Sequence, residues 1–355
     1  MKKKIYLVLA LGLLIASLSG CAVKKNQVAY TVYPVGYLAN RIIGDKLQVV
    51  SIQNDEIVQR ATLVDDYENQ LELSQNLFHI GTLEPYLTVN SEQIKKTKVG
   101  TNDLSVLNAI YKFQRYTPVN VDGTTTYIES SYYKGETFET IDSYEKDLYL
   151  WMDPIAMLSM AKDITKWLST NYEEDSKYFN ENLVNLEKDL VQLDAEYQKL
   201  ATKLANEGKE IKFVSMTPSF GNWQKAYGFQ VYPVVLSKFG ALPTDEQLQV
   251  IKNRILADNV QYIVYEPNLP EDMIALLEQL ETELGLKRVT MNNLSSLTTT
   301  QKEENKDYVS IMYENLSSLE SMATTIPVVT STKVTEQLDE KTVESGNPHD
   351  DIATN

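Results

Sequence analysis

Few side chains in this sequence of 355 residues are of the types that carry out chemistry. It has one cysteine and two histidines, His79 and His349. Asp65, Asp66 and Glu68 form a short acidic cluster, and paired carboxylates can take part in acid–base catalysis. In a chain with 49 acidic and 33 basic residues, however, such a cluster on a loop is by default a solvated surface feature.

Motifs of the common enzyme classes are absent from the sequence. It has no glycine-rich phosphate loop, no nucleophile elbow and no HExxH helix. We therefore predict that the protein is not an enzyme.

The two histidines also give little support to a metal site. His79 is expected at the end of a strand beside Gly81, where a packed histidine is favoured over a binding one. His349 stands beside Asp350 and Asp351, where a solvated charge cluster is favoured over a weak ion site. A site built from several histidines is therefore not expected.

The start of the chain has the pattern of a lipoprotein signal. Residues 2–4 are lysines, and residues 5–18 are mostly apolar but too few for a comfortable membrane span. Leu18-Ser19-Gly20-Cys21 then resembles a bacterial lipobox, in which the cysteine is diacylated and becomes the mature N-terminus. A buried apolar cysteine is the alternative, which the position after the signal core disfavours. We predict a signal peptide at 1–20, a tether at 21–27, and lipid anchoring on the extracytoplasmic face of the cell membrane.

The charge of the chain excludes one class of partner. The formal net charge is −16, and binding to nucleic-acid phosphates requires clustered lysine and arginine. We therefore predict no nucleic-acid partner. Acylation of Cys21 would leave no thiol for a disulfide, so packing alone must hold the mature protein.

One long amphipathic stretch organises the elements. Apolar residues recur at alternating steps of four and three, as on one face of a helix. They are Phe179, Leu183, Leu186, Leu190, Leu193, Tyr197, Leu200 and Leu204. We predict a helix over residues 176–208 that bridges two lobes and is closed by Gly208. A coiled-coil dimer seam is the alternative, disfavoured because the heptads stop after about four repeats.

Strand-like and helix-like segments alternate on both sides of this helix. Strands are expected near residues 28–33, 47–52, 77–80, 211–216, 231–236, 262–265 and 287–291. Such alternation predicts an α/β fold of two lobes with parallel sheets flanked by helices, at residues 28–175 and 209–323.

Two stretches are predicted to lack regular structure. Residues 118–147 show little periodicity and are expected to form a loop. Residues 324–355 are expected to be a disordered acidic tail. From Pro327 onward this tail has no aromatic residue, and it has six acids against two lysines.

Six short motifs occur in a fixed order along the chain. They are Tyr33-Pro34 with Ile43-Gly44-Asp45-Lys46; Gly81-Thr82-Leu83-Glu84-Pro85-Tyr86; Leu150-Trp151-Met152-Asp153-Pro154; Phe220-Gly221 with Ala226-Tyr227-Gly228; Glu266-Pro267; and residues 308–316. In this order they resemble the metal-binding lipoproteins of ABC importers, the zinc and manganese substrate-binding proteins grouped with streptococcal adhesins. The resemblance covers roughly residues 28–323. It implies a solute bound between two lobes, and a bridging helix that limits their hinge motion.

The resemblance also implies four metal-ligand positions, which in this chain hold Asp65, Tyr149, Thr217 and Asn292. Zinc prefers imidazole, thiolate or carboxylate ligands, so only Asp65 is a strong ligand among the four. An oxygen-only set suits a harder ion such as calcium, but one carboxylate supplies little charge to replace the water of the ion. A standard zinc site is therefore not expected.

We therefore predict a surface-anchored solute-binding lipoprotein of an ABC importer with a non-standard interlobe site. Its partners are the membrane, through the lipid, an ABC permease, and a small solute or ion. The candidate cleft residues are Asp65, Tyr149, Thr217 and Asn292, with Tyr33, Glu68 and Glu266 near them. Neutral hydrogen-bonding groups suit a small polar organic ligand as well as an ion, so no cofactor is assigned and a divalent metal stays open. The alternative is an adhesin or scaffold that kept the fold and lost the solute.

Overall fold

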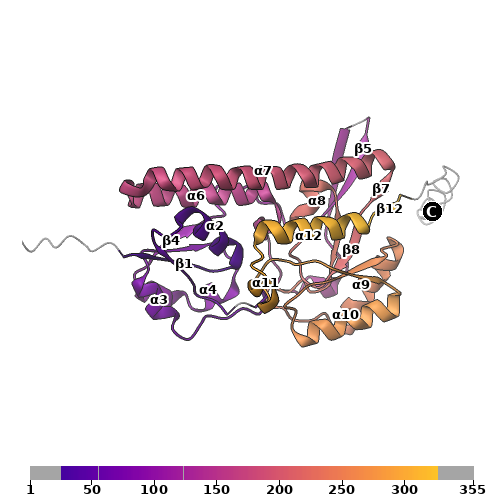
Figure 1. Ribbon diagram of the computed structural model, residues 1–355. Helices are drawn as coiled ribbons and strands as arrows, with labels where there is room; N and C mark the ends of the chain where they lie inside the picture. Colours follow the sequence, from indigo (N-terminus) through magenta and orange to yellow (C-terminus); the bar gives the residue numbers. More distant parts are fainter. Residues whose placement is uncertain (1–24, 55, 123, 327–355) are drawn as a thin grey trace, which may run out of the picture.

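The computed structural model describes residues 25–54, 56–122 and 124–326 (Figure 1). The predicted signal peptide, Cys21, residues 327–355 and His349 lie outside the described residues. Two four-stranded parallel sheets are joined by one continuous helix of 32 residues, α7 (Ser176–Glu207). This confirms the predicted fold class.

The first sheet and its helices form the N lobe. Its strands are β1 (Gln27–Tyr30), β2 (Gln48–Ser51), β3 (Asn76–His79) and β4 (Gly100–Asp103), in the order β2-β1-β3-β4. Its helices are α2 (Tyr33–Ile43), α3 (Tyr67–Leu73), α4 (Pro85–Val89) and α5 (Ser91–Lys96). Proline in the first turn favours the starts of α2 and α4, because a helix leaves its first N–H groups unbonded in any case.

The second sheet and its helices form the C lobe. Its strands are β8 (Lys212–Ser215), β9 (Gln230–Pro233), β10 (Tyr262–Tyr265) and β11 (Lys287–Thr290), in the order β11-β10-β8-β9. Its helices are α8 (Asn222–Tyr227), α9 (Asp245–Ala257), α10 (Glu271–Leu284), α11 (Thr299–Glu303) and α12 (Tyr308–Ser321). Counted along the chain within each lobe, both sheets therefore have the order 2-1-3-4.

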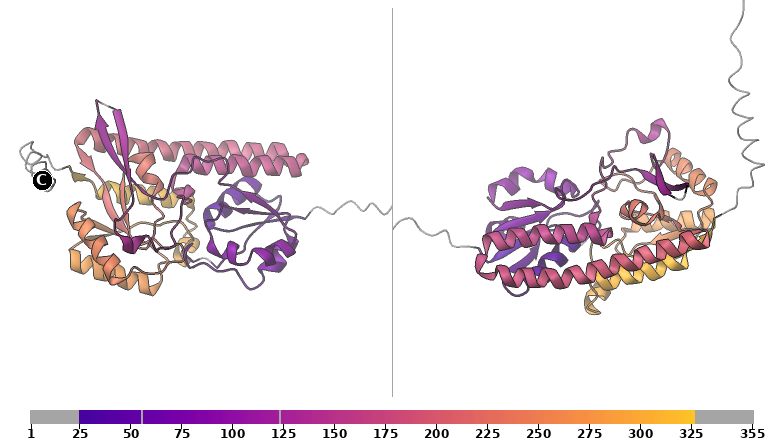
Figure 2. Two further views of the ribbon diagram at one scale, coloured as in Figure 1. Left: turned by 180° about the vertical axis from the view of Figure 1, so that it is seen from behind. Right: turned by 90° about the horizontal axis from the view of Figure 1, so that it is seen from above.

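Helix α7 lies along both lobes. Its predicted apolar seam is buried, except that Leu183 is only partly covered, and the seam belongs to one core that contains residues of both lobes. Gly208, with φ of +63°, ends the helix in the left-handed conformation that glycine adopts without strain. Figure 2 shows α6 (Pro154–Asn171) beside the N-terminal half of α7, and α12 beside its C-terminal half.

The sequence analysis did not identify α6. Its start is nevertheless encoded locally, because Asp153 accepts a hydrogen bond from the Ile155 N–H over 2.8 Å and Pro154 occupies the first turn. The helix buries Met157, Met160 and further apolar residues in the core shared with α7.

The prediction of a loop at residues 118–147 is wrong for its first part. This part belongs to a hairpin of β5 (Arg115–Val121) and β6 (Thr124–Ser130), which are antiparallel. The hairpin contacts β9 and α8, so it packs on the C lobe and not on the N lobe, to which residues 28–175 were assigned. Asp122-Gly123 is a frequent hairpin-turn pair, and it was the available signal.

The two ends of the described chain also differ from expectation. Gln27 belongs to β1 and not to a tether. Thr324 and Thr325, predicted as part of the tail, form β12 (Thr324–Thr325), which pairs antiparallel with β7 (Lys209–Glu210). No helix in the described ranges is long and apolar enough to cross a membrane.

Candidate functional site

The candidate site lies where the strands of both sheets end. In open α/β sheets, ligands bind outside the carboxyl ends of the strands, at the point where the strand order reverses. Thr31 and Glu84 follow β1 and β3 in the N lobe, and Thr217 and Glu266 follow β8 and β10 in the C lobe. In each lobe the threonine hydroxyl donates a hydrogen bond to the glutamate carboxylate. Both lobes therefore carry the same pair of side chains at equivalent strand ends.

Glu266 is a buried carboxylate whose two oxygens are both hydrogen-bonded. Oε1 accepts hydrogen bonds from the N–H groups of Met216 and Thr217, over 2.8 and 2.9 Å. Oε2 accepts from Thr217 Oγ1 and, over 2.8 Å, from Asn293 Nδ2. Burial raises the pKa of Glu266, and these hydrogen bonds oppose the rise.

Glu84 is equally buried but has far fewer partners. Its Oε1 accepts the hydrogen bond from Thr31, whereas its Oε2 has no hydrogen-bond partner among the described residues. Burial raises the pKa of Glu84 to about 8, which the Thr31 hydrogen bond only partly opposes. The hydroxyl of the neighbouring Tyr86 is also buried without a partner in the described structure.

Tyr149 lies between the lobes, directly before the short 3₁₀ helix at Leu150–Met152. Its ring is fully buried against Tyr144 and Trp151, with centroids 5.9 and 5.3 Å away. Its hydroxyl has no hydrogen-bond partner of normal geometry in the described part of the chain. Burial is the main cause of its raised pKa, and the nearby carboxylates of Asp147 and Glu266 add to it.

Asp147 is a third buried carboxyl in this region. Its Oδ1 accepts hydrogen bonds from the Tyr149 N–H over 3.2 Å and from Asn222 Nδ2 over 3.0 Å. Burial raises its pKa to about 7. Asn222 Nδ2 also donates to the Tyr149 carbonyl over 3.1 Å, so α8 of the C lobe holds both the Asp147 carboxylate and the backbone at Tyr149.

Asn292 is held by contacts within the C lobe. Its Nδ2 donates to Gln301 Oε1 over 3.0 Å, and its Oδ1 accepts from the Leu294 N–H over 2.6 Å. The next residue, Asn293, donates to Glu266 and accepts from Trp151 Nε1 at its carbonyl, over 2.8 Å. This segment therefore joins Glu266 to the residues around Tyr149.

The remaining predicted residues lie elsewhere or at the margin. Asp65, in the loop before α3, and Glu68, in the first turn of α3, are both exposed. No hydrogen bond or ion pair of the described residues connects them to Tyr149, Thr217 or Glu266. Tyr33, at the start of α2, stacks with Tyr37 at 6.5 Å. His79 Nδ1 lies 3.1 Å from the carbonyl oxygen of Gly81, a local turn contact.

A cavity of about 500 Å³ opens between the lobes next to these residues. It is lined from the N lobe by Thr82 and Pro85, and from the other side by the segment 142–148, Lys238 and Phe239. Tyr144 lines it, and its hydroxyl donates to the Leu83 carbonyl over 2.9 Å. Because Tyr144 packs against Tyr149, this cavity is the nearest described approach to the buried site.

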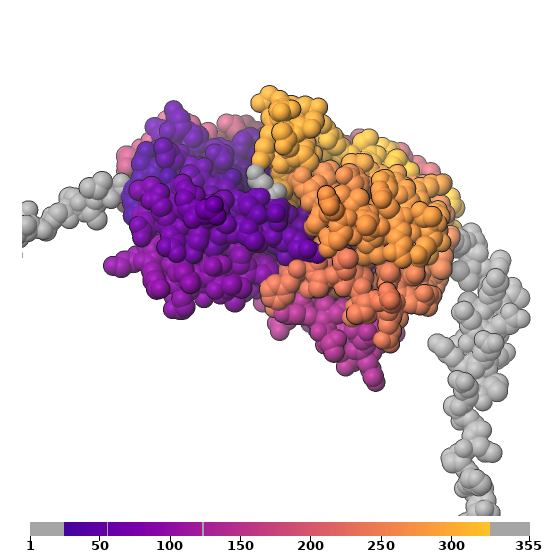
Figure 3. Space-filling view, turned by 90° about the horizontal axis from the view of Figure 1, so that it is seen from below, coloured from indigo at the N-terminus to yellow at the C-terminus, as the bar shows by residue number. Residues whose placement is uncertain are grey.

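The lobes are in direct contact outside the cavity. Figure 3 shows the indigo N lobe meeting the orange C lobe along one boundary. Arg60 of the N lobe donates to the Gly240 carbonyl over 2.7 Å, and it forms an ion pair of 2.8 Å with Asp272 at the start of α10. The described conformation is therefore one with the lobes closed.

The whole described fold matches a known family. Residues 28–322 match the model of the family described as zinc-uptake complex component A, periplasmic (ZnuA). The chain belongs to the ZnuA family. This confirms the resemblance found in the sequence. The family is described by an uptake role and not by an enzymatic one, which agrees with the prediction that the protein is not an enzyme.

Two curated relatives resemble half of the chain. The zinc-binding lipoprotein AdcA of Streptococcus pneumoniae is 25% identical over 176 residues, which cover 50% of this chain and 34% of AdcA. The high-affinity zinc uptake system protein ZnuA of Bacillus subtilis is 26% identical over 177 residues, which cover 50% of this chain and 53% of that protein. The matched segment thus spans about a third to a half of these relatives.

Solved structures share the fold over most of the chain. Zn(II)-bound AdcA from Streptococcus pneumoniae has a TM-score of 0.64 at 19% identity, and the match covers 86% of this chain and 59% of the AdcA chain. A mutant structure of the laminin-binding adhesin Lmb of Streptococcus agalactiae has a TM-score of 0.64 at 19% identity, and the match covers 84% of this chain and 99% of the Lmb chain. These matches show that the ZnuA-family fold is present.

Among the described residues, no group of three or more His, Cys, Asp or Glu side chains is placed to hold a metal ion. Tyr149, Thr217 and Asn292 offer a phenol, a hydroxyl and an amide, which are weak zinc ligands when neutral.

Thr31, Glu84 and Asp147 of the candidate site were not predicted from the sequence. A signal for Glu84 was present, because Glu84-Pro85 and Glu266-Pro267 are the same dipeptide after strands of equivalent position in the two ZnuA-family lobes. Asp147 had no comparable signal, since only its burial distinguishes it from the many exposed acids of the chain.

Proposed function

We propose that the protein is the solute-binding component of an ABC importer and binds its solute between the two lobes. Membership of the ZnuA family supports this role, as do the names of the relatives, which describe zinc binding and zinc uptake. An ABC permease is then the protein partner.

The observation that carries the proposal is a set of buried polar atoms without partners at the carboxyl ends of the two sheets. They are Glu84 Oε2, Tyr86 Oη, Tyr149 Oη and Ser295 Oγ. Leaving a polar atom buried and unpaired costs about 1 to 3 kcal/mol, so a fold gains when a ligand satisfies several of them together. Both lobes contribute such atoms, as a ligand bound between lobes requires.

The chemistry of these atoms favours a small polar organic solute. Three hydroxyls and one carboxyl that holds its proton up to about pH 8 offer both donors and acceptors. The cleft residues we propose are Tyr149, Thr217, Asn292, Glu266 and Tyr33, together with Glu84. Asp65 and Glu68 belong to the proposal only as residues at its margin, and a divalent metal is the alternative ligand.

We expect micromolar zinc or manganese to leave the melting temperature nearly unchanged. A ligand at a hundredfold excess over its Kd stabilises the native state by about 2.7 kcal/mol, which a thermal shift detects readily. Native mass spectrometry and elemental analysis of protein purified without chelator would identify a co-purified organic solute. A zinc-induced rise that Asp65→Ala abolishes would return the chain to the ordinary metal-binding members of the family.

An adhesin or scaffold role is the second candidate. Two observations favour it: Tyr149 and Thr217 are fully buried in the closed lobes, and one relative with this fold is a laminin-binding adhesin. Native mass spectrometry separates the two functions, because a scaffold that has lost its solute co-purifies with none.

We also propose that Cys21 carries lipid and anchors the protein on the outer face of the membrane. The lipobox-like sequence Leu18-Ser19-Gly20-Cys21 supports this, and AdcA is named a lipoprotein. Cys21→Ala is expected to block lipid attachment and to shift the protein out of the membrane fraction. If Cys21→Ala stays in that fraction with unchanged electrophoretic mobility, the anchor is of another kind.

A further inference from the structure

A cavity of about 740 Å³ lies far from the proposed solute site. It is bordered by the β5–β6 hairpin, by the last turns of α7 and by strand β7. Lys212 and Gln230, at the amino ends of β8 and β9, also line it. The proposed solute site stands at the opposite, carboxyl ends of the same parallel strands. The two sites are therefore separated by the length of the C-lobe sheet.

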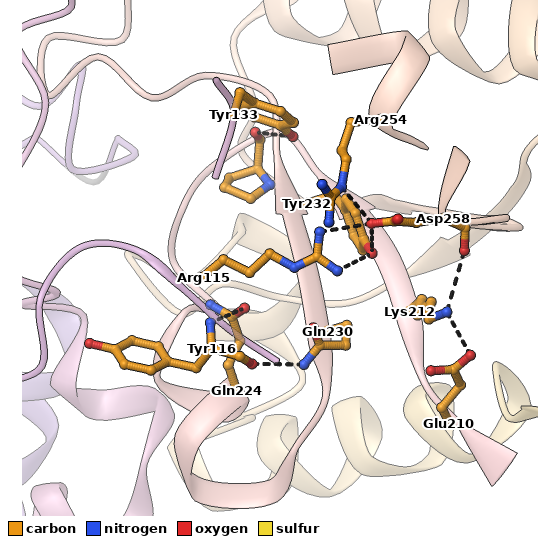
Figure 4. A network of polar contacts seen from close by, with 11 residues as sticks. Arg115, Tyr116, Tyr133, Glu210, Lys212, Gln224, Gln230, Tyr232, Arg254 and Asp258 are labelled. Carbon is orange, nitrogen blue, oxygen red and sulfur yellow. Dashed lines mark hydrogen bonds and ion pairs between the residues drawn. The ribbon is translucent and has the colours of Figure 1, made fainter. Parts of the chain in front are cut away.

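One wall of this cavity carries excess positive charge. Asp258 Oδ2 accepts hydrogen bonds from Arg115 Nη1 and Arg254 Nε, both over 2.7 Å, and from Tyr232 Oη over 2.6 Å (Figure 4). Two guanidinium groups thus share one carboxylate. Lys212 does not change this balance, because it forms an ion pair of 2.6 Å with Glu210.

This local charge opposes the −16 of the whole chain. The Arg254 side chain is 41% exposed, and its terminal nitrogens make no hydrogen bond to other described residues. They can therefore donate to an anion in the cavity. A planar guanidinium binds a carboxylate with two parallel hydrogen bonds.

Two further polar atoms in this wall lack partners. Arg115 Nε and Gln230 Oε1 have no hydrogen bond among the described residues, although the two residues are only 5% and 3% exposed. Figure 4 labels both side chains, which come from β5 and β9. A donor and an acceptor of this kind in one cavity wall match a hydroxyl group, which accepts one hydrogen bond and donates another.

The rest of the lining mixes short polar and aliphatic side chains. Thr117, Gln198 and Thr202 provide hydroxyl and amide groups, while Pro118, Leu204 and Ile326 provide apolar contact. Pockets for small molecules combine such apolar area with a few convergent polar groups. This pattern fits a small ligand that carries both hydroxyl groups and apolar C–H surfaces.

We propose that this cavity is a second binding site, for a polyhydroxylated carboxylic acid of the uronic-acid type. The carboxylate pairs with Arg254 beside Asp258, and the hydroxyls meet the threonine and glutamine side chains. The proposal does not depend on the solute bound between the lobes.

The test compares glucuronate with glucose, which differ in that glucuronate carries a carboxylate at C6. Titration calorimetry or ligand-observed NMR on the full chain is expected to show glucuronate binding at least about tenfold tighter, the ratio that about 1.4 kcal/mol produces. Methyl β-glucuronide blocks the anomeric oxygen as a glycan does, so it separates a free acid from the end of a polysaccharide. Equal binding of glucuronate and glucose, or no binding of either, overturns the proposal.

Two variants locate the site. Arg254→Gln removes the exposed guanidinium and is expected to weaken glucuronate binding about tenfold or more. Ala205→Trp fills the cavity from the exposed side of α7 without touching the charged network, and is expected to abolish binding. Arg288→Gln, an arginine of the same lobe paired with Glu281, is the matched control. Glucuronate binding that survives both Arg254→Gln and Ala205→Trp contradicts the assignment, whereas thermal melts confirm that each variant is folded.

Discussion

Replacing Glu84 with glutamine is expected to remove a large part of the pH dependence of stability. The pKa of this buried carboxyl is about 8 in the folded protein and 4.5 when unperturbed. The folded state therefore binds the proton more tightly. Its contribution to the free energy of unfolding is full below pH 4.5 and is lost as the pH rises through 8, at about 1.4 kcal/mol per pH unit. The total is at most roughly 5 kcal/mol.

Glutamine cannot ionise and still accepts the Thr31 hydrogen bond, so Glu84→Gln should lose this slope. Chemical denaturation at a series of pH values from 4 to 9 measures it. Asp147, with a pKa of about 7, adds a similar slope from 3.8 upward, which Asp147→Asn should remove. Glu72→Gln, on an exposed glutamate, is the control. Parallel curves for wild type and Glu84→Gln would mean that Glu84 is already ionised in the folded protein.

Replacing Glu266 with alanine is expected to destabilise the C lobe by roughly 3 to 5 kcal/mol. The substitution leaves four buried donors without their acceptor: the Met216 and Thr217 N–H groups, Thr217 Oγ1 and Asn293 Nδ2. These groups hold together the ends of β8, β10 and β11, so the proposed solute site should be lost with them.

Glu266→Gln tests the same contacts more gently. Its amide oxygen still accepts the two backbone N–H bonds, while the side facing Thr217 Oγ1 and Asn293 Nδ2 changes from acceptor to donor. A smaller loss than in Glu266→Ala is therefore expected in the unfolding free energy. Glu139→Ala, on an exposed loop glutamate, should be nearly neutral. An equally small effect of Glu266→Ala would show that water replaces the carboxylate in this interior.

The sequence predicted the fold well where periodicity is strong. The seam from Phe179 to Leu204 and the strand at Tyr262–Tyr265 both lie where their patterns placed them. The hairpin of β5 and β6 was not predicted because threonine follows threonine along β6 and polar residues lie on both faces of β5, which removes the alternation of apolar and polar residues.

The candidate site was harder to predict because its acidic residues differ from the other acids of the chain in burial and not in residue type. Glu84 and Asp147 are two of 49 acidic residues, and only the three-dimensional structure shows that they are buried with no ion pair to a described lysine or arginine. The resemblance to a family pointed to Tyr149 and Thr217, which are buried, but also to Asp65, which is exposed.

The long helix also sets the distance between the two ends of the described chain. Near its start the Tyr172 hydroxyl donates to the Lys25 carbonyl, and just beyond its end the Ile326 N–H donates to the Gly208 carbonyl. With 32 residues at about 1.5 Å each, α7 keeps these ends roughly 48 Å apart. A linker that joined them in a circular permutant would need at least about 15 residues at ~3.3 Å each. The distance between two probes attached near residues 25 and 326 would therefore report whether α7 is intact.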